Sequence, residues 1–152
     1  MTSQAESIDS APGAYALLIR LAAPEVMAVG KLGDLKFKNG AYCYVGSALR
    51  GLQARVARHL RREKKIRWHI DCLLERGAVM AVLWIHSEER LECVIAQGLR
   101  DRGLASIKGF GASDCRCPSH LFHHLSKEGL KLALVEAFRQ AAGPPRSLEV
   151  AV

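Results

Sequence analysis

The chain has 152 residues, of which 49% are hydrophobic and 24% charged, as expected for a soluble globule of one domain. Its formal net charge of +7 favours anionic partners, above all nucleic acid. No apolar run approaches the ~18 residues of a membrane span, and the five cysteines without a basic leader indicate reduced thiols. We therefore expect a cytoplasmic protein that contacts no membrane.

The N-terminal part of the chain predicts a strand and a hairpin. Residues 1–12 are small and polar, and we expect them to be disordered. Gly13 to Leu21 is a β-prone run. Val26 to Val29 and Asp34 to Asn39 suggest an extra strand or hairpin, before the turn signal Asn39-Gly40.

The next stretch, residues 40–62, combines a short strand with an amphipathic helix. Tyr42 and Tyr44 lie in a β-prone run that ends at Gly46, where the backbone must turn sharply or be approached closely. Residues 51–63 then predict a helix with an apolar stripe at Leu52, Val56 and Leu60. Its polar face carries Arg55, Arg58, His59 and Arg62 at helical spacing.

A dense basic run spans the end of this helix and the residues that follow it. Its members are Arg61, Arg62, Lys64, Lys65 and Arg67. Next to the cationic face of the helix, the run is interpreted as a surface that contacts phosphates. A solvated loop is the alternative interpretation.

The second half of the chain alternates helices and strands. A short helix is expected over Cys72 to Arg76, followed by a buried central strand over Ala78 to His86. Ser87 is a plausible N-cap of a second main helix, with Glu88 and Glu89 in its first turn. The apolar stripe of this helix is Leu91, Val94, Ile95, Gly98 and Leu99.

The last elements are a short strand and a helix. Leu121 to Leu125 follows an irregular, glycine-rich segment and predicts a strand. Lys127 to Gln140 is helical, and its expected buried face is Leu130, Leu134, Ala137 and Phe138. Residues 143–152 are expected to form a loose tail.

Two tripeptides stand before the arginine-bearing helix: Gly13-Ala14-Tyr15 and Tyr44-Val45-Gly46. Together with Arg55, they resemble the GIY-YIG nuclease superfamily, although the gap between them is longer than usual. Three further segments resemble its small Uri-type subgroup, which also occurs fused to endonuclease III-like repair enzymes. They are Gly46-Ser47-Ala48, Trp68-His69-Ile70-Asp71 and residues 110–115, so the resemblance covers about Gly13 to Phe122.

The resemblance implies a single α/β domain over residues 13–142, with a small, mainly antiparallel sheet flanked by helices. It implies a metal-dependent endonuclease that hydrolyses phosphodiester bonds in DNA, directed to structures or lesions, with a repair protein as a partner. A non-catalytic nucleic-acid-binding module on the same scaffold is the alternative. The implied cofactor is Mg²⁺ or Mn²⁺.

The resemblance also implies a role for each site residue. Tyr15 would act on the attacking water and Tyr44 would assist it, while Arg55 would contact the scissile phosphate with His59 beside it. Glu92, expected one turn inside the second main helix, is the best candidate for the metal ligand. The expected nucleic-acid-binding residues are Arg58, Arg62, Lys64, Lys65 and Arg67.

His69 and Asp71 are further site candidates. On a strand they would share a face and could form an acid/base or metal pair. In a turn, Asp71 could instead cap the following helix.

The cysteines leave a second metal hypothesis open. Cys115, Cys117 and His120 offer three soft ligands, and His123 or His124 could supply a fourth for zinc. This spacing is not that of a standard zinc knuckle, so we expect no structural zinc. A metal-cysteine interaction module is a third functional hypothesis. Three cysteines in apolar contexts are interpreted as core: Cys43, Cys72 and Cys93.

Overall fold

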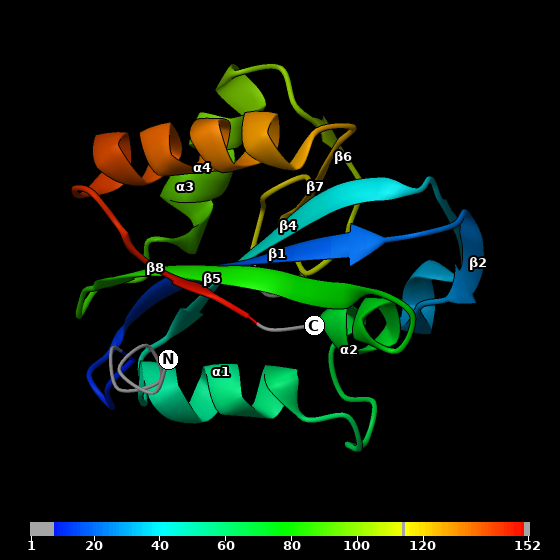
Figure 1. Ribbon diagram of the computed structural model, residues 1–152, viewed down its shortest axis with the longest axis horizontal. Helices are drawn as coiled ribbons and strands as arrows, with labels where there is room; N and C mark the ends of the chain where they lie inside the picture. The colour runs from blue at the N-terminus through cyan, green and yellow to red at the C-terminus, as the bar shows by residue number, and fades with distance from the viewer. Residues whose placement is uncertain (1–7, 114, 151–152) are drawn as a thin grey trace.

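The computed structural model describes residues 8–113 and 115–150, and within them six strands form one antiparallel sheet in the order β6-β7-β4-β1-β5-β8 (Figure 1). A separate hairpin pairs β2 with β3. The strands are β1 (Gly13–Leu21), β2 (Glu25–Ala28), β3 (Asp34–Phe37), β4 (Gly40–Ala48), β5 (Ala78–His86), β6 (Ala105–Ser106), β7 (Leu121–His124) and β8 (Arg146–Glu149). The α-helices are α1 (Leu52–Leu60), α2 (His69–Leu74), α3 (Glu92–Asp101) and α4 (Lys127–Ala141). The predicted fold class is confirmed.

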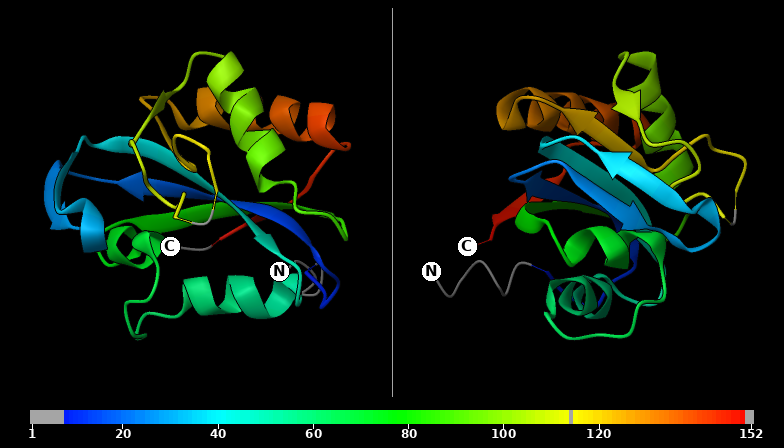
Figure 2. Two further views of the ribbon diagram at one scale, coloured as in Figure 1. Left: turned by 180° about the vertical axis from the view of Figure 1, so that it is seen from behind. Right: turned by 90° about the vertical axis from the view of Figure 1, so that its right-hand side faces the viewer.

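Helices cover both faces of the sheet. Figures 1 and 2 show α1 and α2 on one face and α3 and α4 on the other. In β1, Tyr15, Leu17 and Ile19 belong to the core on the α1 side. The alternate residues Ala14, Ala16 and Leu18 belong to the core on the α4 side. Because successive side chains of a strand point to opposite faces, a strand covered on both sides needs this nearly continuous apolar sequence.

The register of β1 and β4 brings the two motif tyrosines to one face of the sheet. Tyr15 pairs with Gly46, and Leu17 pairs with Tyr44. A Cβ atom at Gly46 would lie 2.6 Å from the hydroxyl oxygen of Tyr15. Glycine is therefore required at this position for the Tyr15 ring to cross β4. The prediction that both tyrosines lie on adjacent strands and on one face is confirmed.

Both predictions of loose ends need correction. Ile8 is buried, and the carbonyl oxygens of Asp9 and Ala11 accept the backbone N–H groups of Gln53 and Leu52 at 2.9 Å. Residues 8–12 thus bond free N–H groups at the start of α1; residues 1–7 lie outside the described residues. The predicted tail contains β8, which pairs with β5. Only residues 151–152 of that tail lie outside the described chain.

The predicted apolar stripe of the first helix is wrong at its last position. Leu60 is 39% exposed, whereas His59, predicted on the polar face, is only 2% exposed. Leu52 and Val56 are buried as expected. The helix also ends at Leu60, earlier than the sequence suggested.

The start of the second main helix also differs from the prediction. The Ser87 hydroxyl accepts the backbone N–H of Glu89 at 3.0 Å in a turn that precedes the helix, so Ser87 is not its N-cap. Glu88 and Glu89 therefore lie before α3, and Glu92 is its first residue. Val94 is exposed and does not belong to the buried stripe. The buried face predicted for α4 is confirmed at all four positions.

No helix among residues 8–113 and 115–150 combines the length and apolar character needed to cross a membrane.

Candidate functional site

A buried tyrosine and a buried histidine meet beneath the end of β4. The Tyr15 hydroxyl lies 2.7 Å from His59 Nε2, and both side chains are almost fully buried. Burial raises the pKa of Tyr15 to about 12 and raises the pKa of Tyr44 further. Burial, assisted by the nearby Arg55 charge, lowers the pKa of His59 to about 3. All three groups are therefore neutral at pH 7.

The neutral His59 ring shares a hydrogen bond with the Tyr15 hydroxyl, and its direction depends on the His59 tautomer. His59 Nδ1 has no hydrogen-bonding partner among the described residues. If the Tyr15 hydroxyl donates to Nε2, its oxygen retains lone pairs that can accept a hydrogen bond from a water molecule. The ring of Tyr44 lies 6.2 Å from that of His59, centroid to centroid. The buried pair therefore lies beside the second tyrosine, with a lone pair of the Tyr15 oxygen still available as a hydrogen-bond acceptor.

Arg55 projects from α1 to the end of β4. Its Nη1 donates to the backbone oxygen of Ser47 at 3.1 Å, and its guanidinium lies over the Trp68 ring at 4.8 Å from the centroid. The side chain is only partly exposed. These contacts fix the cation beside Tyr15, where its charge opposes the effect of burial on the Tyr15 pKa.

Glu92 approaches the same strand end from α3. Its carboxylate accepts a hydrogen bond from the Ser47 hydroxyl, and its side chain is 13% exposed. The only charged partner among the described residues is Arg90, at 3.4 Å. Ser47 therefore links two predicted site residues, Arg55 through its carbonyl and Glu92 through its hydroxyl. The Glu92 charge contributes to the raised pKa values of Tyr15 and Tyr44, so the carboxylate lies within electrostatic reach of both.

Ser47 was not predicted as a site residue. The only signal was its place in the Gly-Ser-Ala segment directly after the second tripeptide. Gly111 is a second residue that sequence reasoning did not assign to the site. A Cβ there would lie 2.8 Å from the Tyr44 ring, so the absence of a side chain lets the segment between β6 and β7 close over that tyrosine.

Asp71 is structural rather than an acid/base or metal partner of His69. It is fully buried, and its carboxylate accepts hydrogen bonds from both Nη atoms of Arg58, at 3.0 and 2.9 Å. It also accepts the backbone N–H groups of Arg67 and Trp68, at 2.9 and 3.0 Å. Burial alone would raise the pKa of Asp71, but these bonds hold it below its ordinary value. The capping interpretation is therefore the better one, since the carboxylate binds the N–H at the start of α2.

His69 is engaged elsewhere. It lies in α2 rather than on a strand, and its Nδ1 accepts the backbone N–H of Gly111 at 2.9 Å. The bond ties α2 to the segment that covers Tyr44. His69 is thus a positioning residue at the border of the site.

The five predicted phosphate contacts divide into two groups. Arg58 is bound to Asp71 and lies 4.3 Å from the centroid of the Trp68 ring, so both of its Nη atoms already have partners within the protein. Lys64 Nζ donates to the carbonyl oxygens of His59 and Arg61, at 2.8 and 2.7 Å, and so closes the C-terminus of α1. The exposed candidates that remain are Arg62, Lys65 and Arg67.

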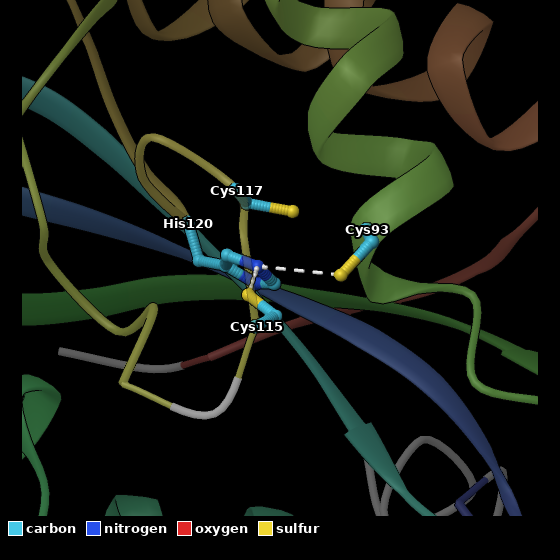
Figure 3. A group of neighbouring side chains, drawn as sticks. All are labelled: Cys93, Cys115, Cys117 and His120. Atoms are coloured by element: carbon cyan, nitrogen blue, oxygen red, sulfur yellow. Dashed lines mark hydrogen bonds between the residues drawn. The ribbon is translucent and has the colours of Figure 1, made fainter.

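Three cysteines and a histidine form a separate cluster (Figure 3). Cys93 comes from α3, whereas Cys115, Cys117 and His120 come from the segment between β6 and β7. Their ligand atoms all lie within 4.8 Å of one another, so the cluster can bind a metal ion. Interpreting Cys93 as a core residue was therefore wrong.

The histidines proposed as a fourth ligand lie elsewhere. His123 donates to the Asn39 carbonyl at 2.9 Å, and His124 accepts the Ser126 N–H at 2.8 Å. Cys93, 22 residues before Cys115 in the sequence, takes the fourth place. No local spacing in the sequence could indicate it.

The fold and the site define an α/β protein with a polar site at the end of two antiparallel strands and a cysteine cluster beside it. The chain matches the family model described as "Domain of unknown function DUF123" over residues 14–143, and it belongs to that family. No curated protein and no solved structure matched the chain. The family description carries no activity, so the GIY-YIG resemblance stays a prediction.

We expect His59 to make the protein sensitive to mild acid. Its pKa falls from 6.5 in the unfolded chain to about 3 in the folded protein, so the unfolded state binds more protons between these values. Stability is then complete above pH 6.5 and falls as the pH decreases toward 3, with a slope of up to about 1.4 kcal/mol per pH unit. His59→Gln should lose this part of the pH dependence.

Urea unfolding of both proteins from neutral pH to about pH 4 measures the difference. The matched control is His86→Gln, because His86 is exposed. Identical pH slopes for the wild type and His59→Gln would show that His59 is not held neutral by the fold.

Proposed function

We propose that the protein is a metal-dependent endonuclease that hydrolyses phosphodiester bonds in DNA. One observation carries the proposal: side chains from β1, β4, α1 and α3 converge at the end of β4. They are Tyr15, Tyr44, Arg55, His59 and Glu92. Phosphodiester hydrolysis requires an oriented water, a group that accepts its proton, and positive charge near the phosphate oxygens. This set contains a candidate for each requirement.

In this proposal, Tyr15 and His59 bind the attacking water and accept its proton. The water donates a hydrogen bond to the Tyr15 oxygen while the Tyr15 hydroxyl donates to His59 Nε2. As the water attacks, its proton passes to Tyr15 and the Tyr15 proton passes to His59. The pKa of His59, about 3, keeps Nε2 unprotonated and free to accept the Tyr15 hydrogen bond at neutral pH, and it also makes the ring a weak base that holds the transferred proton only transiently. Tyr44 positions the water from the neighbouring strand.

Arg55 and Glu92 would act on the phosphate side. The guanidinium has donors beyond the one bound to Ser47, and these can bind two phosphate oxygens in one plane. Glu92 would hold Mg²⁺ or Mn²⁺, which supplies Lewis-acid stabilisation of the developing charge. The residues fit such an ion, because Glu92 offers a partly accessible hard carboxylate beside the Ser47 hydroxyl.

The segment after α1 would hold the DNA. Arg62, Lys65 and Arg67 are exposed there, and they follow the helix that carries Arg55. Phosphate contacts of this kind supply affinity without reading sequence. A preference for branched or damaged DNA would agree with a role in repair and with a repair protein as partner.

Incubation of the protein with plain, nicked, branched and abasic DNA tests this function. We expect strand scission of at least one substrate with Mg²⁺ or Mn²⁺ and none with EDTA. Binding of all substrates without scission would support the non-catalytic nucleic-acid-binding module instead.

A further inference from the structure

We propose that Cys93, Cys115, Cys117 and His120 form a structural zinc site that fastens the segment between β6 and β7 to the start of α3. The site is distinct from the predicted magnesium position at Glu92 and does not depend on the proposed hydrolysis. Figure 3 shows the four side chains directed toward one another, from two segments that are distant in sequence.

The orientation of His120 is that of a metal ligand. Its ring is buried, and its Nδ1 donates to the carbonyl oxygen of Val45 at 3.1 Å. The carbonyl fixes the tautomer, so the lone pair of Nε2 faces the sulfur atoms of Cys115 and Cys93, at 3.3 and 3.8 Å. Zinc-binding histidines commonly donate their other ring nitrogen to a backbone carbonyl in this way.

The ligand set selects zinc over the hard cations. Thiolates and imidazole prefer zinc, whereas magnesium requires oxygen ligands. Bond lengths of about 2.3 Å to sulfur and about 2.0 Å to nitrogen place a sulfur and a nitrogen ligand of a tetrahedral site about 3.5 Å apart. The two sulfur-to-nitrogen separations in the cluster, 3.3 and 3.8 Å, lie on either side of this value. Four protein ligands leave no open position, which is typical of a structural site.

The position of the cluster indicates which elements a bound metal would hold together. The His120 carbonyl accepts a hydrogen bond from the Val45 N–H at 3.0 Å, which extends the pairing of β4 to the residue before the start of β7. Cys93 directly follows Glu92, and Ser47, which binds Glu92, is two residues from Val45. A metal bound here would connect three elements: the β6–β7 segment, β4 and α3. It would thereby hold the Glu92 end of α3 against β4.

Metal analysis of the full-length protein, purified under reducing conditions without a chelator, tests the proposal. We expect one zinc per chain, lost in Cys93→Ser and Cys115→Ser. The matched control is Cys72→Ser, because Cys72 lies outside the cluster and should leave zinc binding unchanged. Retention of zinc by both cluster variants would overturn the assignment.

A second measurement uses the wild type alone and so remains decisive if the variants fail to fold. The reduced protein, stripped of metal, is titrated with Co²⁺ and then with Zn²⁺. We expect thiolate-to-cobalt charge-transfer bands, displaced by Zn²⁺, and a thermal midpoint that rises with Zn²⁺ but not with Mg²⁺. The absence of such bands, or native cysteines found joined as a disulfide by thiol titration, would contradict the site.

Discussion

Glu92→Gln is expected to abolish DNA cleavage while leaving DNA affinity nearly unchanged. Glutamine keeps the volume of the side chain and can still accept the Ser47 hydroxyl, so the start of α3 should remain in place. It loses the negative charge that a hard cation requires. If the carboxylate holds the catalytic metal, we expect turnover to fall on the order of 10³-fold or more.

Glu88→Gln and Glu89→Gln are the matched controls. Both residues are exposed, lie before α3, and carry the same charge close to Glu92 in the sequence. We expect both variants to cleave at the wild-type rate. Single-turnover cleavage with Mg²⁺ compares the three variants, and equilibrium binding with Ca²⁺ checks that affinity is kept. Wild-type cleavage by Glu92→Gln would remove the assignment of Glu92 as the metal ligand.

Asp71→Ala is expected to destabilise the fold by about 3–5 kcal/mol, because it leaves a largely buried charge without its partner. The guanidinium of Arg58 and the N–H groups of Arg67 and Trp68 would all lose their acceptor. The ring of Trp68, which lies under Arg58 and Arg55, would lose part of its support. We therefore expect the arginine of the candidate site to become less well positioned.

Urea unfolding monitored by tryptophan fluorescence measures this effect. Glu75→Ala is the control, since Glu75 is an exposed carboxylate at the end of the same helix, and its loss should change stability by about 0.5 kcal/mol or less. The Asp71 carboxyl has a lowered pKa when folded. Its contribution is therefore complete above pH 3.8 and is lost as the pH falls through the folded value. Equal losses of unfolding free energy in both variants would show that the buried ion pair contributes no more to stability than an exposed carboxylate.

The strands that carry the tyrosines could be predicted because their signals are local. The β-prone runs, the glycine at position 46 and the turn at Asn39-Gly40 lie within short segments. The register of β1 with β4 was not predicted, because the β2–β3 hairpin separates the two strands in the chain. The buried stripe of α4 was equally local, since four apolar residues recur at helical spacing.

The burial of His59 could not be predicted from helical phase. The period of α1 places it beside Arg55 on the polar face, and only its contact with Tyr15, 44 residues away in the sequence, explains why it is buried. The partner of Asp71 was missed for the same reason. Arg58 was read as a surface charge, although it lies 13 residues from the carboxylate that binds it.

Elements that form only through tertiary contacts could not be predicted from the sequence either. Strand β8 is short, polar and preceded by Pro144-Pro145, so only its pairing with β5 identifies it. Cys93 carries no signal of its own, and its role appears only when α3 is placed against the β6–β7 segment. Ser47 became a site residue because its hydroxyl meets a carboxylate 45 residues later in the chain.

The central claim is that the assembly at the end of β4 performs phosphodiester hydrolysis. The most direct test is single-turnover DNA cleavage with Mg²⁺ at a saturating protein concentration, compared between the wild type and Arg55→Ala. We predict that the wild type cleaves DNA. Arg55→Ala should bind DNA with similar affinity but cleave it on the order of 10²-fold more slowly, because the guanidinium acts mainly on charge that develops in the transition state. Failure of the wild type to cleave DNA that it binds, or equal cleavage by both proteins, would contradict the account.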